Sequence, residues 1–159
     1  KARAVEPLNE LKIKSQLEPA IIGLLHNSKK KHGCGAGLGM AAVSCEGDIY
    51  LCHRFVGMSE FKVGSVFDER LDRERFVKSV DKMEACEDCF AKYYCGGGCK
   101  YDHAATNDSL FSPSPDLCQI RRRELELAVS VVAQLNEDDR QFLIEQKIFP
   151  RKPCPFDFG

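Results

Sequence analysis

Apolar residues recur at helical spacing in four parts of the chain. They do so over residues 1–31, where two prolines interrupt the pattern, and again over residues 70–84 and 117–135. A shorter repeat covers residues 138–147. Because spacings of three and four residues place side chains on one face of a helix, the pattern predicts four helical segments. We expect the aliphatic stripe of the long 117–135 helix to face a core.

A different pattern predicts a β-hairpin between the first two helical segments. Two short apolar runs, residues 40–44 and 49–52, flank a Glu-Gly-Asp turn at residues 46–48. Residues 85–118 hold the densest cysteines, three consecutive glycines and a Ser-Pro loop, so we expect mostly loop there. The predicted fold class is α+β: a small domain with a hairpin, cysteine-rich loops and flanking helices.

The composition is that of a soluble globular protein. Of the 159 residues, 43% are hydrophobic and 30% are charged, and the formal net charge is -1 with both signs interspersed. This balance gives no electrostatic reason to expect a nucleic acid partner. Without an apolar stretch of membrane-spanning length or a signal peptide, we expect a cytoplasmic protein that does not bind membranes. The chain begins without Met, as an excised domain would.

Nine cysteines are far above ordinary usage for a chain of this length. An odd number cannot all form disulfides, and in a reducing cytosol clustered cysteines usually bind metal. In order, the spacing is Cys34-x12-Gly47-x4-Cys52, then Cys86-x2-Cys89-x5-Cys95-x3-Cys99, then Cys118. A Cys-x2-Cys pair places two thiolates on one tight turn, and thiolates are the ligands that iron–sulfur clusters require.

Three consecutive glycines separate Cys95 from Cys99. Glycine permits positive φ and lets the backbone lie close to a bulky cluster, which a side chain would obstruct. Because three glycines disfavour a helical turn, the two flanking cysteines can point to different centres. One cysteine of a run serves the neighbouring cluster in two-cluster ferredoxins as well.

Two other uses of the cysteines compete with clusters. A disulfide scaffold requires an oxidising compartment and leaves an odd thiol. Zinc is the more serious alternative, because Cys-x2-Cys pairs are common in zinc ribbons and four cysteines within residues 86–99 could hold one ion. A single zinc site leaves Cys34, Cys52 and Cys118 without a role, which favours clusters.

The whole cysteine pattern resembles the SPASM domain, found at the C-terminal end of many radical S-adenosylmethionine (SAM) enzymes. All seven cysteines of the pattern and its glycine, Gly47, match over residues 34–118. The sequences 34–37, 48–57 and 90–95 look like the peptide-modifying branch that installs thioether crosslinks. Within that branch they look most like the maturases of the quinohemoprotein amine dehydrogenase small subunit.

The resemblance implies two auxiliary [4Fe–4S] clusters. The second cluster would have a complete set of thiolates, from Cys86, Cys89, Cys95 and Cys118. The first would be bound by Cys34, Cys52 and Cys99. In several relatives a fourth cysteine lies just upstream of the first, but residues 1–33 of this chain contain none.

Three candidates remain for the fourth position of the first cluster. Cys45 lies at the predicted hairpin tip, more than about 10 Å from Cys52 at about 3.3 Å per residue, so we interpret it as a half-buried or exposed structural thiol. Cys154 is remote in sequence but could fold back. The third candidate is an open iron position, filled by a substrate thiolate, water or a histidine such as His32. We favour the open position, because an enzyme that joins a cysteine sulfur to carbon can use it to hold that sulfur.

Other polar residues near the pattern are candidates for chemistry. His53 follows Cys52 directly, where some relatives have a carboxylate implicated as the base that takes up a substrate proton, and an imidazole could play that part. We expect Asp102 and His103 to be solvated loop residues, although they could act in the second shell of a cluster. We expect residues 121–123, three arginines, to form a solvated face.

The family's Cys-x3-Cys-x2-Cys motif, which holds the SAM cluster, does not occur in this chain. The sequence therefore predicts three parts: a helical lead-in (1–33) from an N-terminal radical SAM domain, a twin-cluster domain (34–118), and C-terminal helices with a Pro-rich tail (119–159). The whole enzyme would use SAM and a third [4Fe–4S] cluster to modify a peptide or protein substrate, with electrons from an external donor. A stand-alone electron-transfer module and a zinc-stabilised interaction domain are the alternatives.

Overall fold

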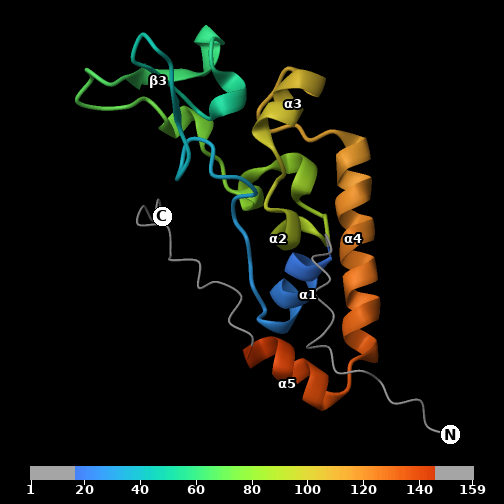
Figure 1. Ribbon diagram of the computed structural model, residues 1–159. Coiled ribbons are helices and arrows are strands. Elements are labelled where there is room, and N and C mark those ends of the chain that lie inside the picture. The colour runs from blue at the N-terminus through green and yellow to red at the C-terminus, as the bar shows by residue number, and fades with distance from the viewer. Residues whose placement is uncertain (1–16, 146–159) are drawn as a thin grey trace, which may run out of the picture.

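The computed structural model describes residues 17–145 and has mixed α and β structure, which confirms the α+β class. The α-helices are α1 (Glu18–Leu25), α2 (Lys92–Cys95), α3 (Lys100–Asn107), α4 (Pro115–Gln134) and α5 (Glu137–Glu145). The strands are β1 (Ala42–Val43), β2 (Asp48–Tyr50) and β3 (Lys62–Ser65). The sheet lies at one end of the molecule, α1 and α5 lie at the other, and α4 runs along the side between them (Figure 1).

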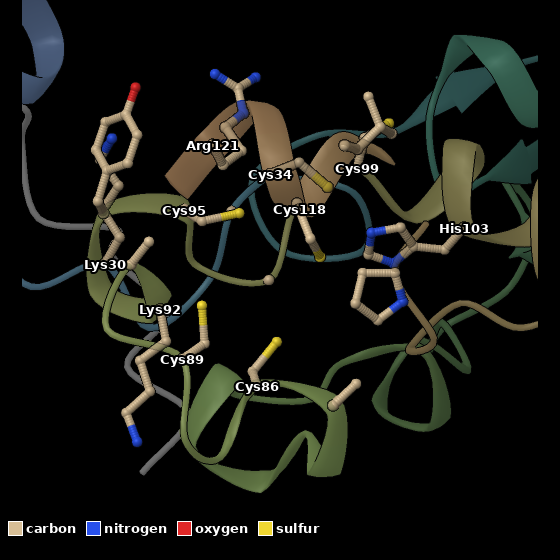
Figure 2. A pocket seen from close by; sticks show the side chains of 18 of the residues that line it. Lys30, Cys34, Cys86, Cys89, Lys92, Cys95, Cys99, His103, Cys118 and Arg121 are labelled. Carbon is tan, nitrogen blue, oxygen red and sulfur yellow. The ribbon is translucent and has the colours of Figure 1, made fainter. Parts of the chain in front are cut away.

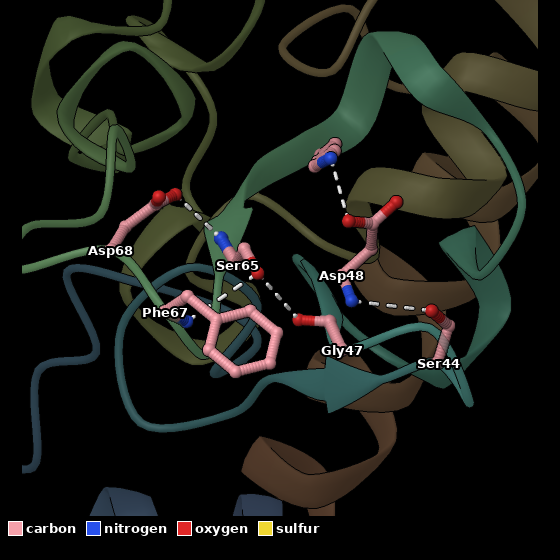
Figure 3. Close-up of polar contacts among 7 residues, drawn as sticks. Ser44, Gly47, Asp48, Ser65, Phe67 and Asp68 are labelled. Carbon is pink, nitrogen blue, oxygen red and sulfur yellow. Dashed lines mark hydrogen bonds and ion pairs between the residues drawn. The ribbon is translucent and has the colours of Figure 1, made fainter.

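The predicted hairpin is present, with a third strand beside it. Strands β1 and β2 pair antiparallel with Val43 opposite Ile49, and β3 pairs antiparallel with the other edge of β2. Gly47 has a φ of 88° in the turn and its carbonyl accepts a hydrogen bond from the Ser65 hydroxyl (Figure 3). An ion pair of 2.6 Å between Lys62 Nζ and Asp48 Oδ1 adds to the β2–β3 contact.

The prediction of a helix over residues 70–84 is wrong. Two separate 3₁₀ turns, Glu74–Phe76 and Val80–Lys82, stand there, and Val77 and Ser79 between them are extended. Phe76 packs in the larger core cluster with Leu51, whereas Val80 packs in a second cluster. Because these apolar side chains serve two cores, an extended link replaces the helix that their spacing predicted.

The cysteine-rich stretch 85–118 is more helical than expected. Cys95 is the last residue of α2, Cys99 is the N-cap of α3, and Cys118 lies in the first turn of α4. Between the first two, glycines 96–98 all have positive φ values, of 66°, 91° and 82°. The expectation of a non-helical glycine connection is therefore confirmed, while short helices hold the cysteines at its ends.

The core has a larger and a smaller part. The larger cluster centres on Leu51 and Phe55, both fully buried, and the Phe61 ring packs against Phe55 in a tilted arrangement with ring centroids 4.4 Å apart. The smaller cluster is built from Val80, Met83 and Cys86. Because only two small clusters bury apolar surface, a bound group would add to the stability of the fold.

The long helix α4 packs against α1, but not through the expected stripe. Leu125 and Ala128 are its buried residues, while Ile120 and Leu127 are 53% and 41% exposed. The prediction that the aliphatic stripe is core is therefore wrong for these residues. None of the helices within residues 17–145 has both the length and the apolar character required to cross a bilayer.

The predicted lead-in is described only from residue 17 onward, where α1 forms its helical part. The rest of the lead-in, the Pro-rich tail and Cys154 lie outside the described residues. The boundary predicted between residues 118 and 119 falls inside α4, which begins at Pro115.

We expect Gly96→Ala to lower the free energy of unfolding by about 1–3 kcal/mol or more, because φ at Gly96 is +66°. A Cβ there would also stand 2.6 Å from the backbone nitrogen of Gly33. Gly39→Ala is the matched control, since its Cβ would meet nothing within 4 Å. Urea unfolding of both variants, followed by circular dichroism, tests this. Equal urea midpoints for the two variants would show that the close contact between the Gly33 and Gly96 backbones does not contribute to stability.

Candidate functional site

A cavity of about 360 Å³ lies between α2, the glycine connection, the beginnings of α3 and α4, and the segment after α1. Six of the seven cysteines of the sequence pattern line it, and Figure 2 shows their side chains around this space. They are Cys34, Cys86, Cys89, Cys95, Cys99 and Cys118. Cysteines far apart in the sequence therefore share one cavity.

Short local structures place the four thiols predicted for the second cluster. Cys86 ends a 3₁₀ turn, Glu84–Cys86, and its carbonyl accepts a hydrogen bond from the Cys89 N–H at 3.1 Å. Cys95 follows at the end of α2, and Cys118 enters from α4. The tight Cys-x2-Cys turn and two helix ends thus bring the four thiols to one cavity.

Burial and proximity disfavour the ionised form of these thiols. Burial, followed by the neighbouring Cys118, Cys95 and Cys89, raises the pKa of Cys86 to about 11. Burial also raises the pKa of Cys95 and of Cys118. Since metal ligation requires thiolates, a bound cationic group would have to displace these protons. The donor set therefore suits a group that offers several strong bonds to sulfur.

Arginines of α4 lie beside the same thiols. Arg121 lines the cavity and forms an ion pair of 2.7 Å with Glu124. A hydrogen bond to Cys89 raises the pKa of Arg122, as does the charge of that thiolate. Arg123 pairs with Glu126. All three arginines are exposed, which agrees with the prediction of a solvated face, although Arg121 also lines the cavity.

The three cysteines predicted for the first cluster lie in adjoining places. Cys34 and Cys99 line the cavity, whereas Cys52 is buried in the core cluster against which Cys34 packs. Arg54 connects the Cys52 segment to α3: its Nη1 lies 3.6 Å from Cys99 Sγ and 2.7 Å from Asp102 Oδ1. Two of these three cysteines thus line the cavity, and Cys52 is not among its lining residues.

A buried lysine lies near this first group of cysteines. Lys100 is 8% exposed, and its ammonium donates a hydrogen bond of 2.6 Å to the carbonyl of Ala36. No carboxylate within residues 17–145 forms an ion pair with it. Burial lowers the pKa of Lys100, while the charges of Cys34 and Cys52 act in the opposite direction. A buried ammonium in this position favours an anionic group beside it.

Three other candidates from the sequence, Cys45, His53 and His32, do not line the large cavity. Cys45 is exposed in the hairpin turn, 3.0 Å from Glu46 Oε1, which agrees with its interpretation as an exposed thiol. His53 is exposed on the 3₁₀ turn His53–Phe55 and does not line the cavity. His32 lines a small neighbouring cavity of about 10 Å³ with Cys34, and its buried Nδ1 has no hydrogen-bond partner.

The prediction of solvated loop residues is wrong for Asp102 and His103, because both lie in α3 and line the large cavity. Asp102 is half-buried and pairs with Arg54, and His103 is only 2% exposed. The signal for its position was the spacing of four residues from Cys99, which places both on one face once α3 forms. Because residues 85–118 were expected to be mostly loop, the spacing did not indicate that Cys99 and His103 share a face.

The described thiols are free but do not form a single-ion site. All eight cysteines in residues 17–145 are unpaired. In this part of the chain, no three histidine, cysteine or carboxylate side chains lie close enough together to hold one metal ion. Four thiolates on zinc would all lie about 2.3 Å from one centre, whereas cluster thiolates bind separate irons and stand farther apart.

Comparison with known proteins adds a distant relative. No family model matches the chain. A protein of Archaeoglobus fulgidus described as "Uncharacterized protein" is 29% identical over 107 residues, which cover 64% of this chain and 26% of that protein. The chain thus spans about a quarter of the length of this relative.

In the reduced, metal-free protein at pH 8, we expect iodoacetamide to modify Cys45 much faster than Cys86. Cys45 is exposed, whereas Cys86 is buried and its pKa is about 11 rather than 9.0. Two pKa units correspond to about a hundredfold less thiolate than at an unperturbed site. Mass spectrometry of timed samples gives both rates, which should converge in urea.

Glu46→Gln is the companion variant for this measurement. The hydrogen bond to the Glu46 carboxylate raises the pKa of Cys45, so its removal should increase the Cys45 rate and leave the Cys86 rate unchanged. Comparable rates for Cys45 and Cys86 in the folded protein would contradict the burial of Cys86.

Proposed function

We propose that this chain is the auxiliary iron–sulfur region of a radical SAM enzyme that modifies a peptide or protein, forming thioether crosslinks from substrate cysteines. The observation that carries the proposal is the convergence of six patterned cysteines on one cavity of about 360 Å³. The sequence pattern supports it independently, because all seven cysteines have the SPASM spacing.

Seven thiols would supply ligands to two [4Fe–4S] clusters. Four thiols, those of Cys86, Cys89, Cys95 and Cys118, would hold the second cluster. Cys34, Cys52 and Cys99 would supply three thiolates to the first. When bound, such clusters supply one-electron transfer, and their potentials depend on nearby charge and solvent exposure.

The chain's own charged groups support this assignment. Lys100 lies beside the first group of cysteines and Arg54 reaches Cys99, while Arg122 lies beside Cys89. Thiolate-bound clusters are anionic, so these cations would favour binding and make reduction easier. Tyr94 and the glycine connection form part of the wall that separates the thiols from solvent.

The catalytic unit would be larger than this chain. The distant relative is about four times as long as the part that the chain matches, which leaves room for a further domain. That domain would be an N-terminal radical SAM domain that holds SAM and the third cluster. An external donor would supply electrons. His53, exposed beside the buried Cys52, is a candidate proton acceptor for a substrate bound at this surface.

Anaerobically purified or reconstituted protein should contain about eight iron and eight acid-labile sulfide per chain, four for each cluster. Cys89→Ser should lose about four iron by removing one thiolate of the second cluster, and Cys34→Ser should lose the other four. Cys45→Ser is the matched control and should retain all eight, because Cys45 is exposed outside the cavity. One or two zinc ions without sulfide would contradict clusters and support the zinc-stabilised domain.

A second measurement separates an accessory region from a stand-alone electron carrier. With SAM and dithionite, the 159-residue chain should produce no 5′-deoxyadenosine, because it lacks the motif for the SAM cluster. The longer gene product should cleave SAM, and Cys89→Ser in that product should abolish peptide crosslinking while SAM cleavage continues. Liquid chromatography with mass spectrometry measures both products. Unchanged crosslinking in the variant would contradict a role of the second cluster.

A further inference from the structure

We propose that His103 is the fourth protein ligand of the first auxiliary cluster, through its Nε2 atom. This inference rests on the proposed function, because it assumes that Cys34, Cys52 and Cys99 bind a cluster. It replaces the open iron position expected from the sequence with a neutral imidazole from the chain itself.

The proton arrangement of His103 leaves one nitrogen available. Its Nδ1 lies 3.0 Å from the carbonyl oxygen of Leu110. A carbonyl only accepts, so Nδ1 carries the proton and Nε2 keeps its lone pair. Within residues 17–145 Nε2 forms no hydrogen bond, and the residue is only 2% exposed. A lone pair at the wall of a cavity lined by cysteines is available to a bound group, and a metal is one such group.

The imidazole lies at the wall of the cysteine-lined cavity. Figure 2 shows the His103 ring at one side of the cavity, next to the labelled cysteine side chains. A Cβ on Gly98 would stand 2.8 Å from Nε2, so only glycine leaves room for the ring at this place. The φ of +82° at Gly98 imposes the same requirement.

The helical register connects His103 to the first cluster. Cys99 and His103 are one turn apart on α3, and the His103 N–H donates to the Cys99 carbonyl at 3.1 Å. Residues four apart lie on the same face of a helix, so both donors face the cavity together. The second group of cysteines already has four thiols, whereas the group that includes Cys99 has three.

The surroundings of the ring match a metal-bound histidine. Ligating histidines usually donate their second ring N–H to a carboxylate or a backbone carbonyl, which fixes the tautomer and the ring orientation. Leu110 supplies that carbonyl from the core, after α3 ends at Asn107 and Asp108 caps it in a left-handed conformation. His32 is a weaker candidate, because it lines only the small cavity and not the one reached by Cys99.

A histidine ligand would change the charge of the first cluster. Imidazole is neutral and thiolate is anionic, so the cluster would carry one negative charge less than an all-cysteine cluster. Histidine ligands raise the potential of Rieske centres relative to plant-type ferredoxins. We therefore expect the first cluster to be reduced more easily than the second.

The test is pulsed electron paramagnetic resonance of the reduced, cluster-loaded full chain with natural or ¹⁵N-labelled histidine. We expect a directly bound nitrogen, with a ¹⁴N coupling that becomes a ¹⁵N coupling on labelling and is absent in His103→Ala. His103→Cys should retain about eight iron, lose the nitrogen coupling and shift the first cluster to a more negative potential. The matched control, His32→Ala, should keep both the coupling and the potential.

Three outcomes would overturn the inference. They are no histidine coupling in the wild-type protein, a coupling lost in His32→Ala, and a coupling that survives Cys34→Ser. If both His103 variants fail to fold, a variant with His26, His32 and His53 replaced by Ala tests the inference. His103 is then the last histidine in the chain, so the nitrogen coupling must persist. About eight iron without histidine coupling contradicts only this inference, whereas absence of iron and sulfide contradicts the proposed function itself.

Discussion

The contact between Gly33 and the glycine connection 96–98 is the constraint on which the site depends. A Cβ on Gly33 would stand 2.6 Å from the Gly98 nitrogen, and one on Gly96 equally close to the Gly33 nitrogen. The two backbones can approach this closely only because neither carries a side chain. The approach places Cys34 beside Cys95 and Cys99, which come from a segment about sixty residues later in the sequence.

Each glycine of the connection also leaves room for a different neighbour. The sulfur of Met83 lies 2.8 Å from the position of a Cβ on Gly97, and Nε2 of His103 lies at the same distance from one on Gly98. Met83 belongs to the smaller core cluster and His103 to the wall of the cavity. The glycine connection therefore contacts the smaller core cluster, α3 and the segment after α1. These contacts position the thiols that lie between them.

Charge is the second feature that shapes the site. Several buried thiols in one cavity resist ionisation, as the raised pKa values of Cys86, Cys95 and Cys118 indicate. Basic groups from other elements lie beside the thiols, and one of them, Lys100, is buried without a carboxylate partner among the described residues. Burial of an ammonium without a carboxylate partner is costly, and an anionic group beside it would offset that cost.

Local patterns in the sequence were enough to predict the hairpin, the long α4 helix, the non-helical glycines and the cysteines that line the cavity, because neighbouring residues encode these features. Packing between distant segments pairs β3 with β2, assigns Phe76 and Val80 to separate clusters and buries His103. These outcomes depend on contacts between residues distant in the sequence. The periodicity of apolar residues shows which side chains share a face of a helix or strand. It does not show what that face packs against, because that depends on the tertiary structure.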